Sequence, residues 1–294
     1  VVIVSPLGGH WLAGLATRPL ALIIATTDRL QPTSLDQRLP VRGTGDELDR
    51  LSITINGFLD RLARYIAQNR EFTANAAHEL RSPLAAMQSS LEVALNTDRS
   101  ISEYKELLAD VLDECQNLRL LVNQLLLLAE SDAGRMPIGD KPVLLDRIVE
   151  QAVEMFQAVA ESASVELHVQ QQEQVWVKGD AGRLRQVVNN LLDNAIKYTP
   201  PGGHVTLELG RDPQQHRAVL NVRDTGTGIQ PQDIPRIFER FYRSDKARER
   251  DCGSRGLGLG LAICQSIVHA HHGQIEVTSI PDEGSSFTVH LPAA

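Results

Sequence analysis

One histidine lies in a sequence context that could support nucleophilic chemistry. His78 belongs to the segment Phe72–Met87 (FTANAAHELRSPLAAM). On a helix, the inward stripe of this segment would be Phe72, Ala76, Leu80 and Leu84. His78 falls between these positions, so we expect its imidazole to face outward. A neutral imidazole attacks through one nitrogen when an acceptor holds the other N–H, and Glu79 is placed to be that acceptor and a general base.

A proline follows this pair within the same predicted helix. Pro83 has no backbone N–H, so we expect it to kink the helix one turn after His78. A lone exposed histidine is more often a solvated side chain than a nucleophile. The assignment therefore depends on what the rest of the chain carries.

The segment Arg183–Thr199 (RLRQVVNNLLDNAIKYT) predicts a helix with a buried face and a separate polar stripe. The buried face would be Leu184, Val187, Val188, Leu191, Leu192 and Ala195. The polar stripe would be Gln186, Asn190, Asn194 and Lys197. Two amide oxygens one turn apart can bind a hard cation that bridges phosphates, and a lysine can neutralise phosphate charge. A solvated helix face would show the same stripe.

Two glycine-rich turns could complete a nucleotide site. Asp224-Thr-Gly-Thr-Gly-Ile229 follows the predicted strand Ala218–Arg223. Its carboxylate could accept a hydrogen bond from the amino group of adenine, and Gly226 and Gly228 would let the backbone approach the ring. Gly256-Leu-Gly-Leu-Gly-Leu261 opens a predicted helix, whose N-terminal N–H groups and positive dipole suit phosphates.

An aromatic and basic cluster, Ile237–Arg243 (IFERFYR), lies between these two turns. The charged loop Ser244–Arg255 follows it and offers little to bury, so we expect a mobile lid. The sequence contains no G-x-x-x-x-G-K-[S/T] motif, which excludes a Walker-type nucleotide site.

The segment HELRSP around His78 closely resembles the H-box of sensor histidine kinases of the HisKA class. The later motifs, ending with the turn Glu283-Gly-Ser-Ser-Phe287, resemble in order the N, G1, F, G2 and G3 boxes of the GHKL ATP-binding fold. The resemblance implies that His78 is phosphorylated, that Glu79 is the base, and that the Ser82 hydroxyl serves dephosphorylation. The family more often has Thr at the position of Ser82.

The resemblance also implies that the cofactors are ATP and Mg²⁺ and assigns residues to them. It implies that Asn190 and Asn194 bind Mg²⁺ and phosphate, and that Lys197 contacts phosphate. The implied adenine contacts are Tyr198 and Asp224, with Gly226 and Gly228 shaping the turn. The implied phosphate side of the lid is Gly256, Gly258 and Gly260. Three arginines are candidates for the γ-phosphate contact and are not separated by sequence: Arg240, Arg243 and Arg255.

A helical hairpin is expected to carry His78. Its two arms would be separated by a break at Asn96–Ser102, and Ser100-x-x-Glu103 matches a capping box for the second arm. The apolar stripe of that arm is Leu108, Val111, Cys115, Leu118, Val122 and Leu125, widened by Leu107, Leu112, Leu121 and Leu126. One hairpin cannot bury so wide a face, which predicts a homodimer with a four-helix bundle.

Before the hairpin, two helical segments flank a polar connector, Gln31–Gly45. The second segment has a heptad seam at Leu48, Leu51, Ile55, Phe58, Leu62 and Tyr65. The first has a similar seam at Leu12, Leu15, Pro19, Leu22 and Thr26. This pattern predicts a parallel coiled coil and resembles a HAMP signalling module. A helix pair without a signalling role remains the alternative.

The expected fold is multidomain, with an all-α N-terminal part followed by an α+β GHKL (Bergerat-type) ATP-binding sandwich. Three segments alternate apolar and polar residues as strands do: Val165–Val169, Val205–Leu209 and Phe287–Leu291. The expected division is 1–11 end of a transmembrane helix or tail, 12–65 HAMP-like coil, 66–132 hairpin, 133–142 linker and 143–294 catalytic domain.

Composition limits the partners and the compartment. The 294 residues carry a net charge of −8, which does not suit a nucleic-acid binder. The three cysteines have no zinc spacing and are typical of a reducing compartment. Residues 1–17 have no charged side chain and could be the cytoplasmic end of a membrane helix, which predicts a protein of the bacterial inner membrane with this region on the cytoplasmic side.

The family resemblance implies a response regulator as the partner in trans, because no receiver-like segment occurs in this sequence. Two other functions remain open. One is a GHKL-type ATPase that does not modify a histidine. The other is a dimeric scaffold that binds nucleotide without transferring phosphate.

Overall fold

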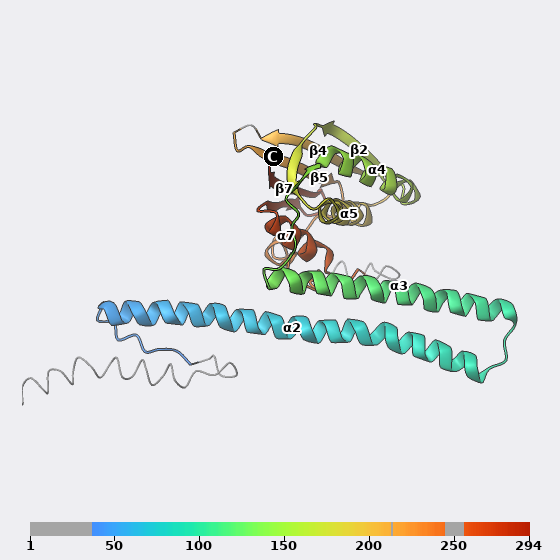
Figure 1. Ribbon diagram of the computed structural model, residues 1–294, viewed down its shortest axis with the longest axis horizontal. Coiled ribbons are helices and arrows are strands. Elements are labelled where there is room, and N and C mark those ends of the chain that lie inside the picture. The colour runs from blue at the N-terminus through green and yellow to red at the C-terminus, as the bar shows by residue number, and fades with distance from the viewer. Residues whose placement is uncertain (1–36, 213, 245–255) are drawn as a thin grey trace, which may run out of the picture. The chain divides into compact units, whose positions relative to one another are not determined.

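The computed structural model describes residues 37–212, 214–244 and 256–294 (Figure 1). The expected membrane segment, the first seam of the coil and the lid residues 245–255, with Arg255, lie outside these residues. Contacts divide the chain into two compact units, residues 1–77 and 78–294. Within the described ranges, no helix combines the length and the apolar character needed to cross a membrane.

Two long helices form the helical part, α2 (Glu47–Asn96) and α3 (Ile101–Asp132). Helix α2 is continuous through Pro83, and the expected boundary between coil and hairpin lies inside it. At the start of α3, the Ser100 hydroxyl accepts from the Glu103 N–H, and the Glu103 carboxylate accepts from the Ser100 N–H. The predicted capping box is confirmed.

In the first unit, the connector is fastened to α2 by side chains of the helix. Asp49 is 3% exposed and accepts from the backbone N–H groups of Arg42 (2.8 Å) and Gly45 (2.9 Å). These hydrogen bonds hold the pKa of the Asp49 carboxyl below its usual value. The Asn56 amide both donates to the carbonyl of Leu39 and accepts from its N–H. The connector is therefore held at both of its described ends.

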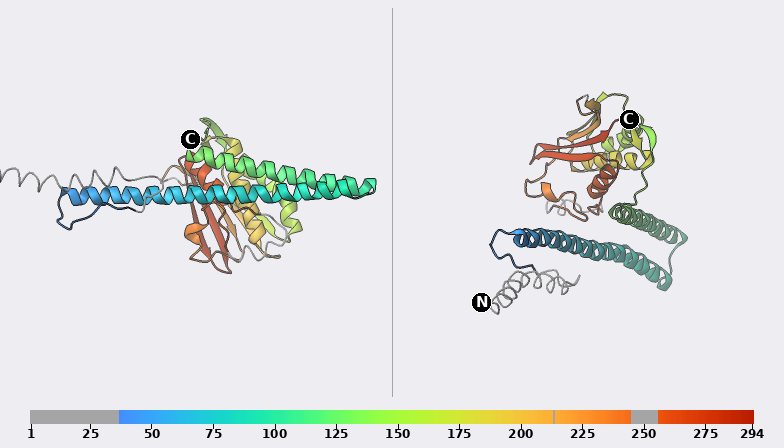
Figure 2. Two further views of the ribbon diagram at one scale, coloured as in Figure 1. Left: turned by 90° about the horizontal axis from the view of Figure 1, so that it is seen from below. Right: turned by 60° about the vertical axis from the view of Figure 1, so that its left-hand side comes forward.

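In the second unit, the C-terminal part of α2 runs antiparallel to α3 (Figures 1 and 2). The Cys115 Sγ lies 3.4 Å from the Met87 Sδ and joins the two helices. Pro83 and Met87 are buried, whereas Leu84 is 58% exposed. The expected inward position of Leu84 is therefore wrong for a single hairpin, because α2 packs on α3 through a neighbouring face.

The C-terminal part is built on a five-stranded sheet with the strand order β2-β4-β5-β7-β6. The strands are β2 (Glu166–Gln172), β4 (His204–Asp212), β5 (Arg217–Asp224), β7 (Gly284–Pro292) and β6 (Gln274–Ile280). Only the β2–β4 pair is parallel. A second sheet pairs β1 (Lys141–Leu144) with β3 (Trp176–Gly179). The four predicted strands are present as β2, β4, β5 and β7, whereas β1, β3 and β6 were not predicted.

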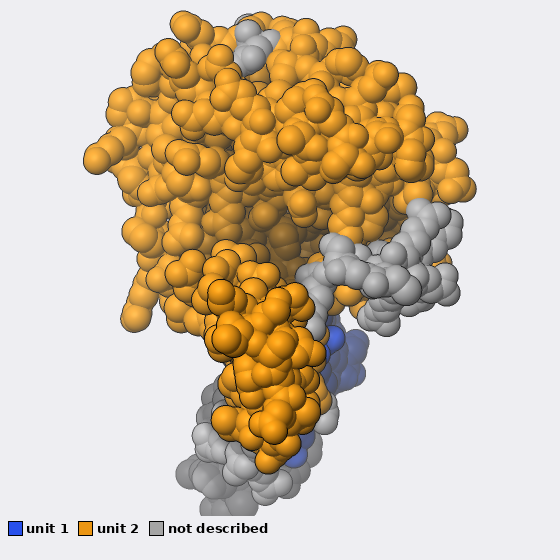
Figure 3. Space-filling view, turned by 90° about the vertical axis from the view of Figure 1, so that its right-hand side faces the viewer, with its two compact units in different colours: residues 1–77 blue, residues 78–294 orange. Residues whose placement is uncertain are grey.

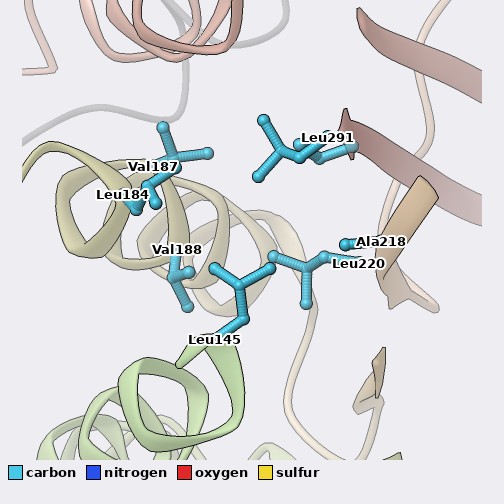
Figure 4. Close-up of a pocket in the computed structure, with 8 residues that line it drawn as sticks. Leu145, Leu184, Val187, Val188, Ala218, Leu220 and Leu291 are labelled. Atoms are coloured by element: carbon cyan, nitrogen blue, oxygen red, sulfur yellow. The ribbon is translucent and has the colours of Figure 1, made fainter. Parts of the chain in front are cut away.

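Helices α4 (Leu145–Ser162), α5 (Ala181–Tyr198) and α7 (Gly260–Ala270) cover one face of the sheet (Figure 2). The predicted buried face of α5 is confirmed at all six positions. Between α4, α5 and the sheet lies a small cavity of about 10 Å³ lined only by aliphatic residues, among them Leu145 and Leu220 (Figure 4). The predicted fold class, a helical part followed by an α+β part, is confirmed.

Candidate functional site

Four of the segments that line one cavity of about 360 Å³ in the second unit carry its predicted residues. They are the polar stripe of α5, the turn after β5, the segment 237–244 that follows the short 3₁₀ helix η1 (Ile234–Arg236), and the start of α7. The predicted residues that line it are Asn190, Asn194, Lys197, Tyr198, Asp224, Gly228, Arg243, Gly256, Gly258 and Gly260. Figure 3 shows the second unit with a hollow on the face toward the viewer.

Asp224 is held rigidly at the end of β5. It is 6% exposed, and its Oδ1 accepts from the N–H groups of Gly226 (2.9 Å) and Ser285 (3.1 Å). Burial raises the pKa of this carboxyl, and the two N–H donors oppose the rise. Among the described residues both hydrogen bonds go to Oδ1, which leaves Oδ2 to accept from the amino group of a ligand.

Glycine is required where the turns approach other backbone. Gly226 is not among the lining residues, and a Cβ there would meet the carbonyl oxygen of Tyr198 at 2.5 Å. Gly228 has φ +61°, and a Cβ there would meet the carbonyl oxygen of Ile280 at 2.1 Å. These steric contacts are consistent with the predicted role of both glycines in shaping the turn after β5.

The amide of Asn190 links α5 to the start of α7. Its Nδ2 donates to the carbonyl of Gly260 at 3.2 Å, so that Oδ1 is the atom left for a cation or a ligand. Leu259 precedes α7 and provides no side-chain cap for the first N–H groups of the helix. Uncapped N–H groups together with the helix dipole favour a bound phosphate.

Charged side chains of both signs reach the cavity. Lys197 Nζ lies 5.5 Å from the centre of the Tyr198 ring, and Asp193 lies one turn earlier on α5. Burial raises the pKa of the Asp193 carboxyl, and the Lys197 ammonium opposes the rise. Lys197 and Arg243 are the cations of this lining.

A second cluster lies where the segment 237–244 meets η1. The Tyr242 hydroxyl donates to Asp233 Oδ1 at 2.9 Å, and the Arg236 guanidinium lies 4.3 Å from the centre of the Tyr242 ring. Asp233 and Tyr242 line the cavity and were not predicted. Their only sequence signal is the aromatic and basic composition of the segment.

Helices α5 and α7 are joined at a second place by His271, which is 4% exposed. Its Nδ1 lies 2.8 Å from the carbonyl of Ile267, and its Nε2 accepts from the N–H of Asp180 at 3.1 Å. Burial lowers the pKa of the His271 imidazole, which favours the neutral ring that these two bonds need. Cys264 adds a contact to Val187, and burial raises the pKa of its thiol to about 12.

Arg240 is not among the lining residues of the cavity. Its Nη1 donates to Asp132 Oδ2 of α3 at 2.7 Å, and its Nη2 donates to Oδ1 of the same carboxylate. Of the three candidate arginines, Arg243 alone lines the cavity among the described residues. The tertiary structure thus separates candidates that the sequence does not.

The predicted phosphoacceptor group lies on α2, apart from the cavity lining. His78 and Ser82 are exposed, and Glu79 is half-buried beside His78. The outward position of His78 agrees with the prediction. A histidine so exposed is accessible to a reagent delivered by another part of the chain or by another protein.

The cavity also has lining residues that were not predicted from the sequence. They include Gln124, Asp193, Thr227, Gln230, Asp233, Ser285 and Phe287. Ser285 and Phe287 lie in β7, within the segment 283–287 that was expected to be a turn, and Asp193 lies inside the predicted helix. Gln124 had no signal, because it lies in the leucine-rich stretch Leu120–Leu128 of the second arm.

The donor set of the cavity fits a nucleotide with its cation. Within the described part of the chain, no group of three His, Cys, Asp or Glu side chains could hold a metal ion. Phosphate oxygens and water molecules can complete the shell of a cation held by amide oxygens. Amide oxygens of Asn190 and Asn194 are hard donors of the kind that Mg²⁺ accepts.

Three family models match the chain. Residues 179–294 match "Histidine kinase-, DNA gyrase B-, and HSP90-like ATPase", residues 68–134 match "His Kinase A (phospho-acceptor) domain", and residues 11–64 match "HAMP domain". Among curated proteins, the sensor histidine kinase CusS of Escherichia coli O157:H7 is 34% identical over 274 residues. This match covers 93% of the chain but 56% of CusS, so the chain spans little more than half the length of that relative.

Solved structures show the same arrangement of elements. Full-length ShkA in complex with AMPPNP matches with a TM-score of 0.57 and 27% identity, over 76% of this chain and 46% of ShkA. The histidine kinase ThkA in complex with the response regulator protein TrrA matches with a TM-score of 0.57 and 20% identity, over 76% of this chain and 61% of that one. The second likeness shows the fold alone.

Proposed function

We propose that this chain transfers the γ-phosphoryl group of ATP to His78. The chain has the HAMP, HisKA and HATPase_c architecture of sensor histidine kinases, and the proposal starts from that architecture. The observation that carries the proposal is the joint presence of a cavity lined by the predicted nucleotide-binding residues and of an exposed His78 next to Glu79. The predicted boundaries of coil, hairpin, linker and catalytic domain are part of the same proposal.

The cavity would bind ATP with the adenine at Asp224 and the phosphates at the start of α7. Asp224 Oδ2 would accept from the adenine amino group, and Tyr198 would pack beside the ring. The phosphates would meet Lys197, the glycines 256, 258 and 260, and the uncapped N–H groups of α7. Mg²⁺, when bound with the nucleotide, would neutralise phosphate charge, and Asn190 and Asn194 would hold it.

The transfer step needs His78 in line with the γ-phosphate. A neutral imidazole nitrogen attacks the γ-phosphorus, the bond to the β,γ-bridging oxygen breaks, and ADP leaves. Glu79 holds the opposite N–H and accepts its proton. Positioning and charge neutralisation supply most of the catalysis in such reactions. Arg243 is the described arginine placed to stabilise the charge that develops.

The hairpin would act as a homodimer. Leu108, Leu112 and Leu126 of α3 are 58%, 59% and 57% exposed in a single chain. Leu84 and Leu91 of α2 are exposed as well, although they are large and apolar. A second hairpin would bury these residues in a four-helix bundle. The predicted coiled coil is supported by the same argument. Its seam residues Phe58 and Tyr65 are more than half exposed in a single chain, and a partner helix would bury them.

The phosphoryl group would pass from His78 to an aspartate of a separate response regulator. ThkA forms a complex with such a protein, and its fold is shared by this chain. The exposed Ser82 hydroxyl, one turn after His78, would serve the reverse task of dephosphorylating the regulator. The HAMP match and the named sensor relatives support a membrane-bound sensor, with this region on the cytoplasmic side of the bacterial inner membrane.

The test is incubation of the chain with γ-labelled ATP and Mg²⁺, comparing the wild type with His78→Gln and with the exposed control His272→Gln. We expect acid-labile, base-stable label in the wild type and in the control, and none in His78→Gln. Hydrolysis of ATP without labelling would favour a GHKL-type ATPase. Binding without hydrolysis or labelling would favour a nucleotide-binding scaffold.

A further inference from the structure

One residue of the helical hairpin takes part in the nucleotide cavity. Gln124 lies on α3 and lines the cavity together with Asn190, Asn194 and Lys197 of α5. Its side chain is half-buried, and within the described ranges its amide has no hydrogen-bond partner. A half-buried amide that faces a cavity without a partner is ready to bind a polar ligand there.

The register of the hairpin places Gln124 level with His78. Met87 on α2 contacts Cys115 on α3, and the two helices run antiparallel. His78 precedes Met87 by nine residues, and Gln124 follows Cys115 by nine residues. With a rise of about 1.5 Å per residue, both lie the same distance, roughly 13.5 Å, along the hairpin from the Met87–Cys115 contact. The cavity therefore reaches α3 at the height of the predicted phosphoacceptor.

The packing of α3 indicates which end of the cavity Gln124 approaches. Helix α3 packs against α7, and α7 contributes only its first two residues, Gly260 and Leu261, to the cavity lining. These residues form the phosphate-binding end in the proposed function. Gln124 therefore approaches the cavity from the side of the phosphates.

Two ion pairs hold α3 in this place. Arg240 pairs with Asp132, and Arg183 Nη2 of α5 lies 3.9 Å from Glu130 Oε2. Both acidic residues lie in the last turn of α3, within eight residues of Gln124. The docking of the catalytic part on α3 is therefore polar as well as apolar, and it orients the face that carries Gln124.

We propose that Gln124 is a nucleotide-binding residue supplied by the hairpin, whose amide N–H donates a hydrogen bond to a phosphate oxygen of bound ATP. The inference rests on the proposed function and deepens it. Through Gln124, helix α3, which packs beside the helix that carries His78, contacts the nucleotide directly. The catalytic part and the hairpin then share one ligand, so that ATP strengthens their docking.

The experiment measures binding of ATP with Mg²⁺ to the full 294-residue chain by titration calorimetry. The variants are Gln124→Leu, which removes the donor, and Gln124→Glu, which adds a negative charge. The matched controls are Gln116→Leu and Gln116→Glu, because Gln116 is exposed on the same helix and does not line the cavity. Adenosine is titrated in parallel because it has no phosphate.

We expect Gln124→Leu to weaken ATP binding about tenfold, the scale of a hydrogen bond to a charged group. Gln124→Glu should weaken it further, because its carboxylate repels the phosphates. Adenosine binding and both Gln116 controls should stay within about twofold of the wild type.

Two outcomes would overturn this proposal alone: ATP affinity unchanged in both Gln124 variants, or adenosine affinity reduced by the same factor as ATP affinity. The first would show that Gln124 makes no contact, and the second that it only supports the shape of the cavity. A wild-type chain that binds no ATP would instead overturn the proposed function together with this inference. The wild-type titration therefore separates the two failures.

Discussion

Both terminal nitrogens of the Arg240 guanidinium donate hydrogen bonds to the carboxylate of Asp132, which lies 108 residues earlier in the sequence. The two side chains are 24% and 32% exposed, so the pair is only partly screened by solvent. It joins the segment 237–244 to the last turn of α3. Arg240, which the sequence made a candidate for the γ-phosphate contact, does not line the cavity.

Breaking this pair should loosen the junction between α3 and the catalytic part. Asp132→Asn keeps the shape of the side chain but removes its charge, and a partly exposed bidentate pair contributes about 1 kcal/mol. We expect trypsin to cut after Arg135, in the non-helical segment that follows α3, about fivefold faster than in the wild type.

Two controls test whether the pair itself is responsible. Asp113→Asn removes an exposed charge elsewhere on α3 and should leave the cleavage rate unchanged. The exchanged pair Asp132→Arg with Arg240→Asp should restore slow cleavage. Equal cleavage rates in Asp132→Asn and the wild type would show that the pair does not hold the junction.

Asp224→Asn should weaken the binding of adenine nucleotides tenfold or more, because a hydrogen bond to a buried charged group is lost. The amide oxygen of asparagine can still accept from Gly226 and Ser285, so the turn should be retained. The new amide nitrogen can donate but cannot accept, so the preference for ATP over GTP should fall as well. Competition binding with both nucleotides measures this change, and an unaltered preference would argue against Asp224 as the adenine contact.

His271 should make stability depend on pH. Its folded-state pKa is lowered by burial, so the unfolded chain takes up the proton first as the pH falls below about 6.5. The stabilisation from the neutral ring is therefore complete above that pH and is lost as the pH falls toward the folded-state pKa.

The measurement is urea unfolding at pH 7.5, 6.5 and 5.5. His271→Gln should be about 1–2 kcal/mol less stable at pH 7.5, because the N–H of Asp180 loses its acceptor. The gap to the wild type should narrow at pH 5.5, and His269→Gln, which is exposed on α7, should show neither effect. A gap that is constant with pH would mean that the ring does not titrate as its burial requires.

Asp49→Ala should release the connector from α2 in the first unit. The amides of Arg42 and Gly45 lose their common acceptor, and we expect their hydrogen exchange to become about tenfold faster. Asp60→Ala removes the exposed ion pair to Arg38 and serves as the control. Exchange that is equally slow in Asp49→Ala and the wild type would show that other contacts hold the connector.

Much of this protein could be predicted from local patterns. A helical period of 3.6 residues is a property of the chain alone, so the spacing of residues was enough to predict the buried face of α5 and the polar stripe with Asn190 and Asn194. The capping box of Ser100 and Glu103 spans only three residues and was predictable for the same reason. The requirement for glycine at Gly226 and Gly228 is different, because the backbone that these residues approach belongs to Tyr198 and Ile280, far away in the sequence.

Other features were decided only by tertiary packing. The sequence does not separate Arg240 from Arg243, because the acceptor of Arg240 lies on another helix. Leu84 belongs to an apolar stripe, but which face of α2 meets α3 is decided by how the two helices pack.

Gln124 is the clearest case of a residue that the sequence alone did not predict. No pattern around it signals a nucleotide, since its role depends on α3 meeting α7 across more than a hundred residues of chain. Periodicity tells which side chains share a face of one element. Only the fold decides which faces of different elements meet, because that choice depends on the packing of the whole chain and on no single segment.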